Sequence, residues 1–558
     1  MNILMIDCVL PSLDKFAGEH DIRHARWNGQ GALVPVHYFI RQVSRSGEIF
    51  RPDVLVQREH LGRRLLLGGL WKLDCPKIFW AVDSHLNLFW QQHYARLFDL
   101  VLTPHARLFA NLSPDVQAAR CLPFTWPGVE RTWRPHGLRQ HTASFVGVLD
   151  TNRIHRLRFT SFLKEQYDIT ATSMPFADML DLYTDTRLLP NESICQEFNF
   201  RIMEGASCGC CVVTEDIGDD LAVNFEPGKE VLTYRHVFEF DELFRFLLAR
   251  PQLAEKIGKA AHERVARCHT EAHRSRFLLE TCAALSATRR ESRQARLDFA
   301  LALAELGRGE PACAPLLKPA QDIFDEEPED WRAAAMSLRL CLEGLSVATD
   351  KESWRARAIQ LCGALAARAP ALAASARLDA ALLLYAAAVR LEDPLWLGEC
   401  RRLLPDVAWD REGSPSDSHV QTALVLARHL GDARRTCRPG FKFDPRSHCP
   451  DSAIELLLLA EGSVRDEQER CSLLAVLSQL SQQSPLRDLA LDSGARYTLR
   501  ARPDWRITLD YALCNLRAFR LKEGLEEALL AQIQAQEAGA ETRFAAAATA
   551  AGLRLPRS

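Results

Sequence analysis

The sequence predicts two consecutive α/β domains with parallel sheets, followed by an all-α region. Short apolar runs of strand character alternate with helical segments over the first half of the chain. From about Arg276 onward strand signals vanish, and apolar residues recur every three or four positions. The 558 residues exceed the roughly 250 to 300 residues that one hydrophobic core serves, so several domains are expected.

We expect domain boundaries near residues 135 and 280. Residues 1–135 and 136–280 each have the size of a nucleotide-binding α/β half, and residues 281–558 form the helical region. The segment Pro123–Pro135 is rich in proline and tryptophan and follows neither the strand nor the helix period. It therefore reads as the linker between the two α/β domains.

The first α/β domain begins with strand-like runs separated by helical sequence. A helix is expected over Leu88–Phe98, where aromatic and aliphatic residues recur near the 3.6-residue period. The predicted strands are Asn2–Ile6, Asp53–Gln57, Lys77–Val82 and Leu100–Thr103.

The second α/β domain opens with the strand Ala143–Leu149, which leads into a polar loop. A helix carrying Glu204 is broken at Gly209, because glycine readily ends a helix. Further strands are expected at Ile169–Thr172 and Cys210–Thr214, and terminal helices at Glu239–Ala249 and Pro251–Arg267.

The remaining residues predict stacked helix pairs of the kind found in tetratricopeptide-like solenoids. No clean 34-residue repeat is present, and Arg435–Cys449 reads as a long loop. The predicted helical segments are Leu297–Leu306, Trp331–Leu345, Ala356–Ala367, Leu378–Leu391, Ile454–Ala460 and Ile507–Leu521.

Composition excludes little but sets expectations for partners. The formal charge is -3 and the pI is near 6.6, which gives no global reason to expect a nucleic acid or an anionic membrane surface. No apolar run approaches the roughly 20 residues of a membrane helix, and the amino terminus reads as a short strand. We therefore expect a cytoplasmic protein without an integral membrane segment.

The block from Asn191 to Tyr234 resembles the nucleotide-sugar-binding half of GT-B glycosyltransferases, most closely the CgeB-like group. That group carries an N-x-R-x-x-E helix before A-x-x-G, a strand and an F-x-x-G-x-E-V segment. The matching residues are Asn199, Arg201, Glu204, Ala206, Gly209, Phe225, Gly228, Glu230 and Val231. The resemblance is strong over 191–274, where His269, Thr270, His273 and Arg274 match its H-T-x-x-H-R ending, and fainter over the rest of residues 1–280.

This resemblance implies a GT-B fold, a nucleotide-diphosphate-sugar donor, no cofactor and no essential metal. It also draws attention to Glu204, because one carboxylate can accept hydrogen bonds from two vicinal ribose hydroxyls. The alternative interpretation is an ordinary surface glutamate on a helix.

The donor-sugar contact departs from the pattern of related retaining enzymes, in which two glutamates are separated by seven residues. Gln196 stands where the first glutamate would be, and Glu197 lies one place too late. The contact could be made by Gln196 or by backbone amides, or it could be lost. Asn199 and Arg201 match the CgeB-like motif, and Arg201 either binds phosphate or pairs with a neighbouring acid.

A basic loop follows the strand Ala143–Leu149 and is the candidate phosphate site. Asn152, Arg153 and Arg156 lie there, where the resembling enzymes bind the donor phosphates. A fixed guanidinium would stabilise the negative charge that develops on the departing nucleoside diphosphate. A solvated basic helix face is the alternative, and Arg153 is the stronger candidate because it lies in the loop itself.

Asp83 and His85 end the predicted strand Lys77–Val82, and CgeB-like proteins carry a similar D-x-H there. Side chains at the carboxyl edge of a parallel sheet face the ligand crevice. Asp83 or His85 could act as general base or orient the sugar. The plain alternative is that Asp83 caps the following helix.

The main hypothesis is a metal-independent glycosyltransferase that transfers a sugar to a protein or glycan acceptor, with the helical region recruiting the acceptor or a protein partner. Phosphate-loop, nucleophile-elbow, zinc-protease and dinucleotide fingerprints are missing from the sequence. The competing hypothesis is a non-catalytic scaffold with a degenerate GT-B domain, which the missing first glutamate and the long helical region favour.

Overall fold

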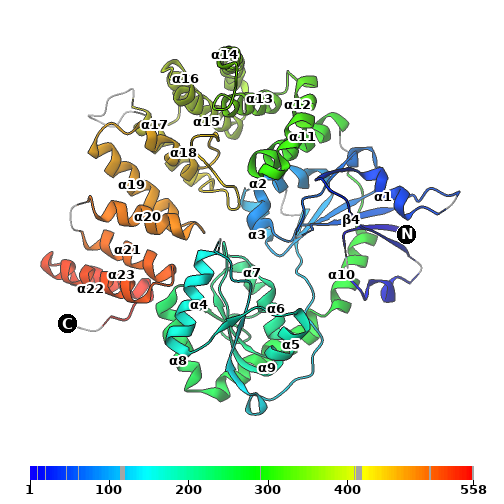
Figure 1. Ribbon diagram of the computed structural model, residues 1–558, viewed down its shortest axis with the longest axis vertical. Helices are drawn as coiled ribbons and strands as arrows, with labels where there is room; N and C mark the ends of the chain where they lie inside the picture. The colour runs from blue at the N-terminus through cyan, green and yellow to red at the C-terminus, as the bar shows by residue number, and fades with distance from the viewer. Residues whose placement is uncertain are drawn as a thin grey trace. The chain divides into compact units, whose positions relative to one another are not determined.

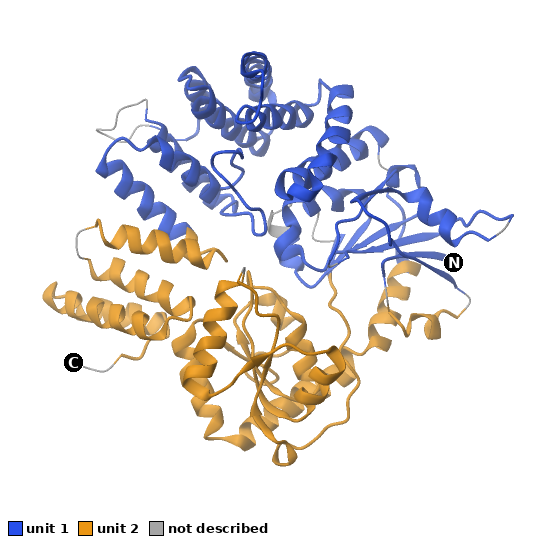
Figure 2. Ribbon diagram, in the orientation of Figure 1, with its two compact units in different colours: residues 1–8, 19–122, 284–480 blue, residues 9–18, 123–283, 481–558 orange. Residues whose placement is uncertain are grey.

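A computed structural model describes residues 1–555 apart from 9, 19, 46, 61, 113–119, 152, 289–290, 408, 410–417 and 502–503, and only the backbone of 110–112. The chain divides into two compact units (Figure 2). Unit 1 contains residues 1–8, 19–122 and 284–480, and unit 2 contains residues 9–18, 123–283 and 481–558. Each unit joins one α/β lobe to part of the helical region.

The predicted fold class is confirmed, since two Rossmann-like α/β lobes are followed by consecutive helices (Figure 1). The division between units differs from the expected boundaries. Residues 284–480 belong with the first lobe, and residues 481–558 belong with the second. The helical region is therefore not one separate body.

The sheet of unit 1 has the strand order β2-β1-β4-β6-β7-β8. The pairs β1–β2, β1–β4, β4–β6 and β6–β7 are parallel. Its strands are β1 (Asn2–Ile6), β2 (Asp21–Ala25), β4 (Val54–Arg58), β6 (Lys77–Trp80), β7 (Leu100–Thr103) and β8 (Cys121–Pro123). Strand β2 pairs with one edge of β1, and β4 and the later strands continue from the other edge. The boundary between β1 and β4 is therefore the topological switch point.

Four of these strands lie within a few residues of the predicted ones, because each is a short run of apolar residues buried on both faces. Strand β2 escaped prediction. Its sequence, D-I-R-H-A, is mostly polar and only partly buried, as suits the edge of a sheet. A two-stranded sheet pairs β3 (Leu33–Pro35) with β5 (Leu66–Gly68).

The helices of unit 1 pack as consecutive pairs, such as α11 with α12 and α13 with α14. The helices of the lobe are α1 (Val36–Val43), α2 (Ser84–Tyr94) and α3 (Ala106–Leu112). Those of the helical region are α11 (Ser292–Gly309), α12 (Leu317–Glu326), α13 (Trp331–Gly344), α14 (Lys351–Arg368), α15 (Ala374–Leu391), α16 (Leu395–Arg402), α17 (His419–Asp432), α18 (Ala453–Ala460) and α19 (Glu467–Gln482).

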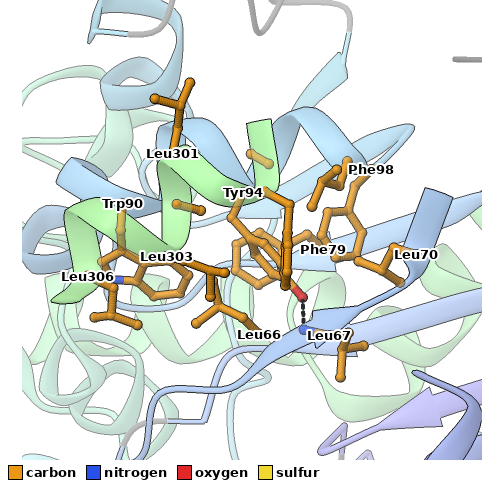
Figure 3. Close-up of a cluster of buried hydrophobic side chains, with 14 of the residues drawn as sticks. Leu66, Leu67, Leu70, Phe79, Trp90, Tyr94, Phe98, Leu301, Leu303 and Leu306 are labelled. Carbon is orange, nitrogen blue, oxygen red and sulfur yellow. Dashed lines mark hydrogen bonds between the residues drawn. The ribbon is translucent and has the colours of Figure 1, made fainter. Parts of the chain in front are cut away.

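Helix α11 shares the core of the first lobe (Figure 3). From Leu297 to Gly309 every residue of this helix is buried, including the charged Asp298, Glu305 and Arg308. Leu303 and Leu306 lie beside Trp90 and Tyr94 of α2. The Tyr94 hydroxyl accepts a hydrogen bond from the backbone of Leu67 at 2.8 Å and so satisfies a polar group inside this core.

Unit 2 contains a second parallel sheet, with the order β14-β13-β12-β9. Strand β10 (Phe145–Val146) continues β9 (His141–Ala143) after Ser144 and pairs with β11 (Ala171–Thr172). The remaining strands are β12 (Thr186–Pro190), β13 (Cys211–Glu215) and β14 (Leu232–Tyr234). Taken together the strands follow the doubly wound order 2-1-3-4-5, so the switch point lies between β9/β10 and β12.

The helices of this lobe are α4 (Ile154–Tyr167), α5 (Phe176–Thr184), α6 (Phe200–Ser207), α7 (Asp219–Ala222), α8 (Val237–Leu248), α9 (Pro251–Cys268) and α10 (Glu271–Ala284). Helices α4 and α8 meet through Phe159 and Phe240, whose ring centroids are 5.6 Å apart. Helix α6 packs against α9 (Figure 1).

The last helices share the core of this second lobe. They are α20 (Arg487–Thr498), α21 (Trp505–Arg517), α22 (Leu521–Glu537) and α23 (Glu541–Ala550). Phe519 follows α21, is only 5% exposed, and lies 4.7 Å from the Phe159 ring. The cluster that holds the sheet residues Phe145 and Val213 also holds Trp505 and Leu516, so residues after 500 help to build this lobe.

Candidate functional site

The carboxyl ends of β10, β12 and β13 gather most of the predicted site residues of unit 2. These strands are followed by residues 147–153, 191–199 and 216–218 respectively. In an open parallel sheet this edge, at the switch point, is where ligands bind. Asp83 and His85 belong to unit 1.

Glu204 lies in α6 as a half-buried carboxyl group. Burial raises its pKa to about 7, against the opposing charge of Arg201. Among the described residues its oxygens have no hydrogen-bond partner. A carboxylate that is partly withdrawn from water and lacks a hydrogen-bond partner is destabilised. A ligand with hydroxyl donors would relieve this cost by hydrogen bonding to its oxygens.

Arg201 is buried and engaged by the protein itself. Its Nε donates to the carbonyl oxygen of Val146 at 3.0 Å, and its Nη1 donates to Asn191 Oδ1. Its guanidinium also lies 4.2 Å from the Phe145 ring centroid. Arg201 thus joins α6 to the end of β10, and its described partners are neutral groups rather than an acid.

Arg156 and Asn199 both support the residues that follow β12. Arg156 projects from α4 and forms a buried ion pair with Glu192, which is fully buried. Asn199, just before α6, donates from Nδ2 to the carbonyl oxygen of Glu192 at 2.9 Å. Both predicted ligand residues therefore hold the backbone of this segment in place.

Gln196 is exposed, at the tip of the same segment. Cys195 and Gln196 have φ angles of 55° and 58°, a left-handed conformation that is unfavourable for residues other than glycine. The neighbouring Glu197 is buried, and Ser193 Oγ donates to its carboxylate at 3.2 Å. Burial raises the pKa of Glu197 well above its usual value.

Arg153 stands just before α4 with an exposed side chain, and its guanidinium has no partner among the described residues. Its backbone amide donates to the carbonyl oxygen of Asp150 at 2.8 Å, which turns the chain into the helix. Asn152 lies outside the described residues. Arg153 is therefore a cation available to ligands at the switch-point edge.

Three residues at this edge were not predicted: Glu215, His155 and Arg487. Glu215 ends β13, and Arg487 Nη1 donates to its carboxylate at 2.8 Å. His155, in the first turn of α4, contacts Glu215 at 3.2 Å and also contacts Arg487. An acid that ends an apolar run was a usable signal for Glu215, but nothing near residue 487 indicated its partner 272 positions earlier.

The H-T-x-x-H-R residues fasten the junction of α9 and α10 to the segment after β8 and to the residues after α7. His269 Nε2 contacts the carbonyl oxygen of Asn224 at 2.9 Å. The carbonyl oxygen of His269 accepts from the Gly128 amide at 2.7 Å. Arg274 Nη2 donates to Thr125 Oγ1 at 2.7 Å.

In unit 1, Asp83 ends the loop that follows β6 and is fixed by Glu59, and His85 lies in the first turn of α2. The Glu59 carboxylate accepts from the backbone amides of Val82 at 2.7 Å and Asp83 at 2.8 Å, and from Asn87 Nδ2 at 2.6 Å. The sequence analysis missed Glu59, which directly follows β4. Asp83 makes no capping hydrogen bond to the described first turn of α2.

His85 is buried and lies beside His105, with ring centroids 5.1 Å apart. Burial lowers the pKa of His85 to about 3, so the ring is neutral near pH 7. A neutral imidazole is a weak base in this environment but a good hydrogen-bonding group. The arrangement favours orienting a hydroxyl over removing its proton.

A cavity of about 630 Å³ opens among α2, α11, α13, α15 and the loop around residues 435–452 of unit 1. Its wall includes Trp331 and Met336 together with several arginines and carboxylates. Asp451 accepts from Arg339 at 3.1 Å and from Arg435 at 3.0 Å. The size and mixed lining suit a ligand with both apolar and polar groups.

No helix of the described residues has the length and apolarity needed to cross a bilayer. The described residues also contain no group of three or more histidine, cysteine, aspartate or glutamate side chains that could hold a metal ion.

Comparison with known structures finds distant likenesses. The Anabaena protein HepE, solved in complex with UDP and glucose, has 12% identity and a TM-score of 0.36, covering 51% of this chain and 100% of its own. A sucrose-phosphate synthase from Thermosynechococcus elongatus has 10% identity and a TM-score of 0.35, covering 50% and 98%. These likenesses are too distant to carry an argument about function.

The sequence comparisons give a local match. No curated protein shows significant similarity to the chain. Residues 150–280 match the family described as glycosyl transferase-like. The match covers α4 to α10, and it includes Glu204, Arg201, Arg153 and Arg156. The family match therefore lies within unit 2.

Proposed function

We propose that the protein is a GT-B glycosyltransferase of the CgeB-like type, which transfers a sugar from a nucleotide-diphosphate sugar to a protein or glycan acceptor. One observation carries this proposal above the others. Glu204 presents a half-buried carboxyl group without a described partner, inside the glycosyl transferase-like domain and next to the switch-point edge. A ribose with two vicinal hydroxyls supplies the donors that this group lacks.

The other residues take their roles from this placement. Arg153 would meet the diphosphate and stabilise the charge that develops as the glycosidic bond to the β-phosphate breaks. Arg156, Asn199 and Arg201 would hold the ligand-binding backbone in shape. Gln196, at the tip of its strained segment, would contact the donor sugar. No metal is required in this scheme, because guanidinium groups supply the positive charge.

Asp83 and His85 are proposed to act on the sugar or the acceptor. Asp83 is the better general base, since the neutral, buried His85 has little affinity for a proton. His85 would orient a sugar hydroxyl instead. We propose a cytoplasmic location because the cysteines that the structure describes are not joined in disulfides, as is typical of a reducing compartment.

A ligand screen tests the donor site. Thermal shifts are measured with UDP, GDP, TDP and CMP derivatives, because a ligand that binds only the folded state raises its melting temperature. Glu204→Ala should weaken binding of the selected nucleotide by roughly 10- to 100-fold, the value of charge-assisted hydrogen bonds to two hydroxyls. Glu263→Ala, an exposed glutamate on α9, is the matched control.

The cavity of unit 1 is the proposed acceptor site. Trp331 lines it, whereas Trp354 on α14 lies outside it and is 40% exposed. Trp331→Ala should reduce transfer to the acceptor at least about fivefold while hydrolysis of the donor stays unchanged, because packing against aromatic side chains carries much of the binding energy in such sites. Trp354→Ala should change neither rate. Loss of hydrolysis together with transfer would contradict this role.

A non-catalytic scaffold is the second candidate, and one observation favours it. The place of the first glutamate of the retaining pattern is taken by Gln196, while Arg156 and Arg201 are consumed by contacts within the protein. Hydrolysis of a panel of nucleotide sugars separates the two candidates. Turnover that Arg153→Ala or Glu204→Ala abolishes supports the enzyme, and no turnover with any donor supports the scaffold.

A further inference from the structure

The carboxyl edge of the second lobe includes a side chain from the helical region. Arg487, the first residue of α20, reaches Glu215 at the end of β13. Its Nη1 and Nη2 atoms contact the two carboxylate oxygens of Glu215, which is the bidentate geometry that fixes a guanidinium most firmly. Both residues lie in unit 2.

The surroundings hold Arg487 in one position. His155 contacts both members of the pair, and Phe519 lies 4.8 Å from the His155 ring. The carbonyl oxygen of Arg517 lies 3.5 Å from Arg487 Nη1. The Glu215 side chain is 7% exposed, and the Arg487 side chain retains 19% exposure. The arginine is thus positioned before any ligand arrives and still reaches solvent.

The Arg487 guanidinium lies at the carboxyl edge of the sheet, where open parallel sheets bind ligands. Strand β13 neighbours β12, and the segment after β12 carries Glu192 and Cys195, both within electrostatic range of Arg487. Of the other arginines at this edge, Arg156 and Arg201 are committed to protein partners. A diphosphate carries more negative charge than Arg153 alone can balance.

We propose that Arg487 is a diphosphate-binding residue of the donor site, supplied by the helical region and held ready by Glu215 and His155. This inference rests on the proposed function. All described contacts of Arg487 use its two Nη atoms, and a guanidinium has five N–H donors, so donors remain for phosphate oxygens. Residue 487 lies outside the family match at 150–280, which makes the helical region a part of the donor site.

Removal of Arg487 alone would leave the buried carboxylate of Glu215 without a counter-charge. The test therefore removes the charge of Glu215 first. Glu215→Gln is the reference, and Arg487→Ala is introduced into it. Asp488→Ala is the control. Asp488 also lies on α20 and joins it to α4 through an exposed ion pair with Arg158 at 2.7 Å. Calorimetry measures binding of UDP and uridine, with GDP and guanosine in parallel, and a melting curve of each unliganded variant reports its folding.

The expected result is a loss of at least tenfold in affinity for the nucleoside diphosphate with unchanged affinity for the nucleoside. Asp488→Ala should bind both ligands like the wild type. Unchanged diphosphate binding in the double variant would overturn the inference, as would equal losses for diphosphate and nucleoside. If the wild type binds none of the UDP, GDP, TDP and CMP derivatives of the screen, the proposed function fails and this inference fails with it. If Glu204→Ala weakens binding and the Arg487 variant does not, only the inference fails.

Discussion

At the residue scale, Glu204 is the residue on which the proposed donor site depends most. The spacing of the N-x-R-x-x-E helix identified the residue, but only the fold shows that its carboxyl group is half-buried and lacks a described partner. Burial raises the pKa of Glu204 to about 7 from a usual value of 4.5. The sequence alone could not supply this value, because burial comes from residues distant in the chain.

The raised pKa of Glu204 predicts a pH dependence of nucleotide binding. The ionised carboxylate is the better acceptor for ribose hydroxyls, so UDP affinity of the wild type should rise by up to about tenfold between pH 6 and pH 8. Glu204→Gln should remove this component. The phosphate of UDP titrates in both proteins, so the difference between them is the quantity measured by calorimetry. Parallel pH profiles for the two proteins would contradict the role of Glu204.

The same shift has a consequence for stability, with a definite sign. The folded state holds the Glu204 proton more tightly than the unfolded chain does. Its contribution to the free energy of unfolding therefore decreases as the pH rises from 4.5 through 7. A group that lowers the stability of the fold near neutral pH is typical of a ligand site. There the ligand provides the hydrogen-bond donors that the protein does not.

Other residues show where reasoning from the sequence stops. Arg201 was predicted to bind phosphate or to pair with an acid, and Arg156 to bind phosphate or to lie on a solvated helix face. In the structure Arg201 contacts Val146 and Asn191, and Arg156 pairs with Glu192. Both arginines lie near the carboxyl edge of the sheet. The motif could not show their partners, because those partners come from other strands, and a local pattern does not encode contacts across a sheet.

At the scale of elements, apolar periodicity predicted the buried strands and the long helices well. Strands β1 and β7 have the predicted bounds, and α9 differs from its prediction by one residue. Strands β2 and β12 were not predicted. The first is polar and lies at an edge, and the second, T-R-L-L-P, is short and ends in proline. Tertiary pairing makes such segments into strands despite weak local preference.

The last helices should stabilise the donor lobe directly. Phe519 is buried against His155, Phe159 and Tyr234, so Phe519→Ala should lower the free energy of unfolding of unit 2 by about 3 to 5 kcal/mol, the usual cost of a large cavity. Leu529→Ala, at a position of α22 that is 42% exposed, should change it by no more than about 0.5 kcal/mol. Denaturant unfolding measures both. Equal effects would show that residues 481–558 are not part of the core of the lobe.

At the scale of the whole molecule, the boundary within the helical region was the least predictable feature. Nothing in the composition changes near residue 480, because both sides are amphipathic helices of similar character. The division arises from packing. Leu303 and its neighbours share a core with the first lobe, and Trp505 and its neighbours share a core with the second. Which lobe a helix joins depends on the tertiary fold.

Two separate cores predict two unfolding transitions. Calorimetry should resolve one transition for each unit. Leu303→Ala should lower the melting temperature of unit 1, and Phe519→Ala that of unit 2. UDP should raise only the transition that Phe519→Ala lowers, because Glu204 and Arg153 belong to unit 2. A single cooperative transition that UDP shifts as a whole would contradict independent units.

The central claim is that the Glu204 carboxylate accepts hydrogen bonds from the ribose hydroxyls of a nucleotide donor. The most direct measurement is calorimetric titration of the nucleotide selected by the screen into the wild type, Glu204→Ala and Glu263→Ala. The account predicts binding by the wild type and by Glu263→Ala, with affinity for Glu204→Ala reduced roughly 10- to 100-fold. Equal affinity of all three proteins, with each one folded, would contradict it.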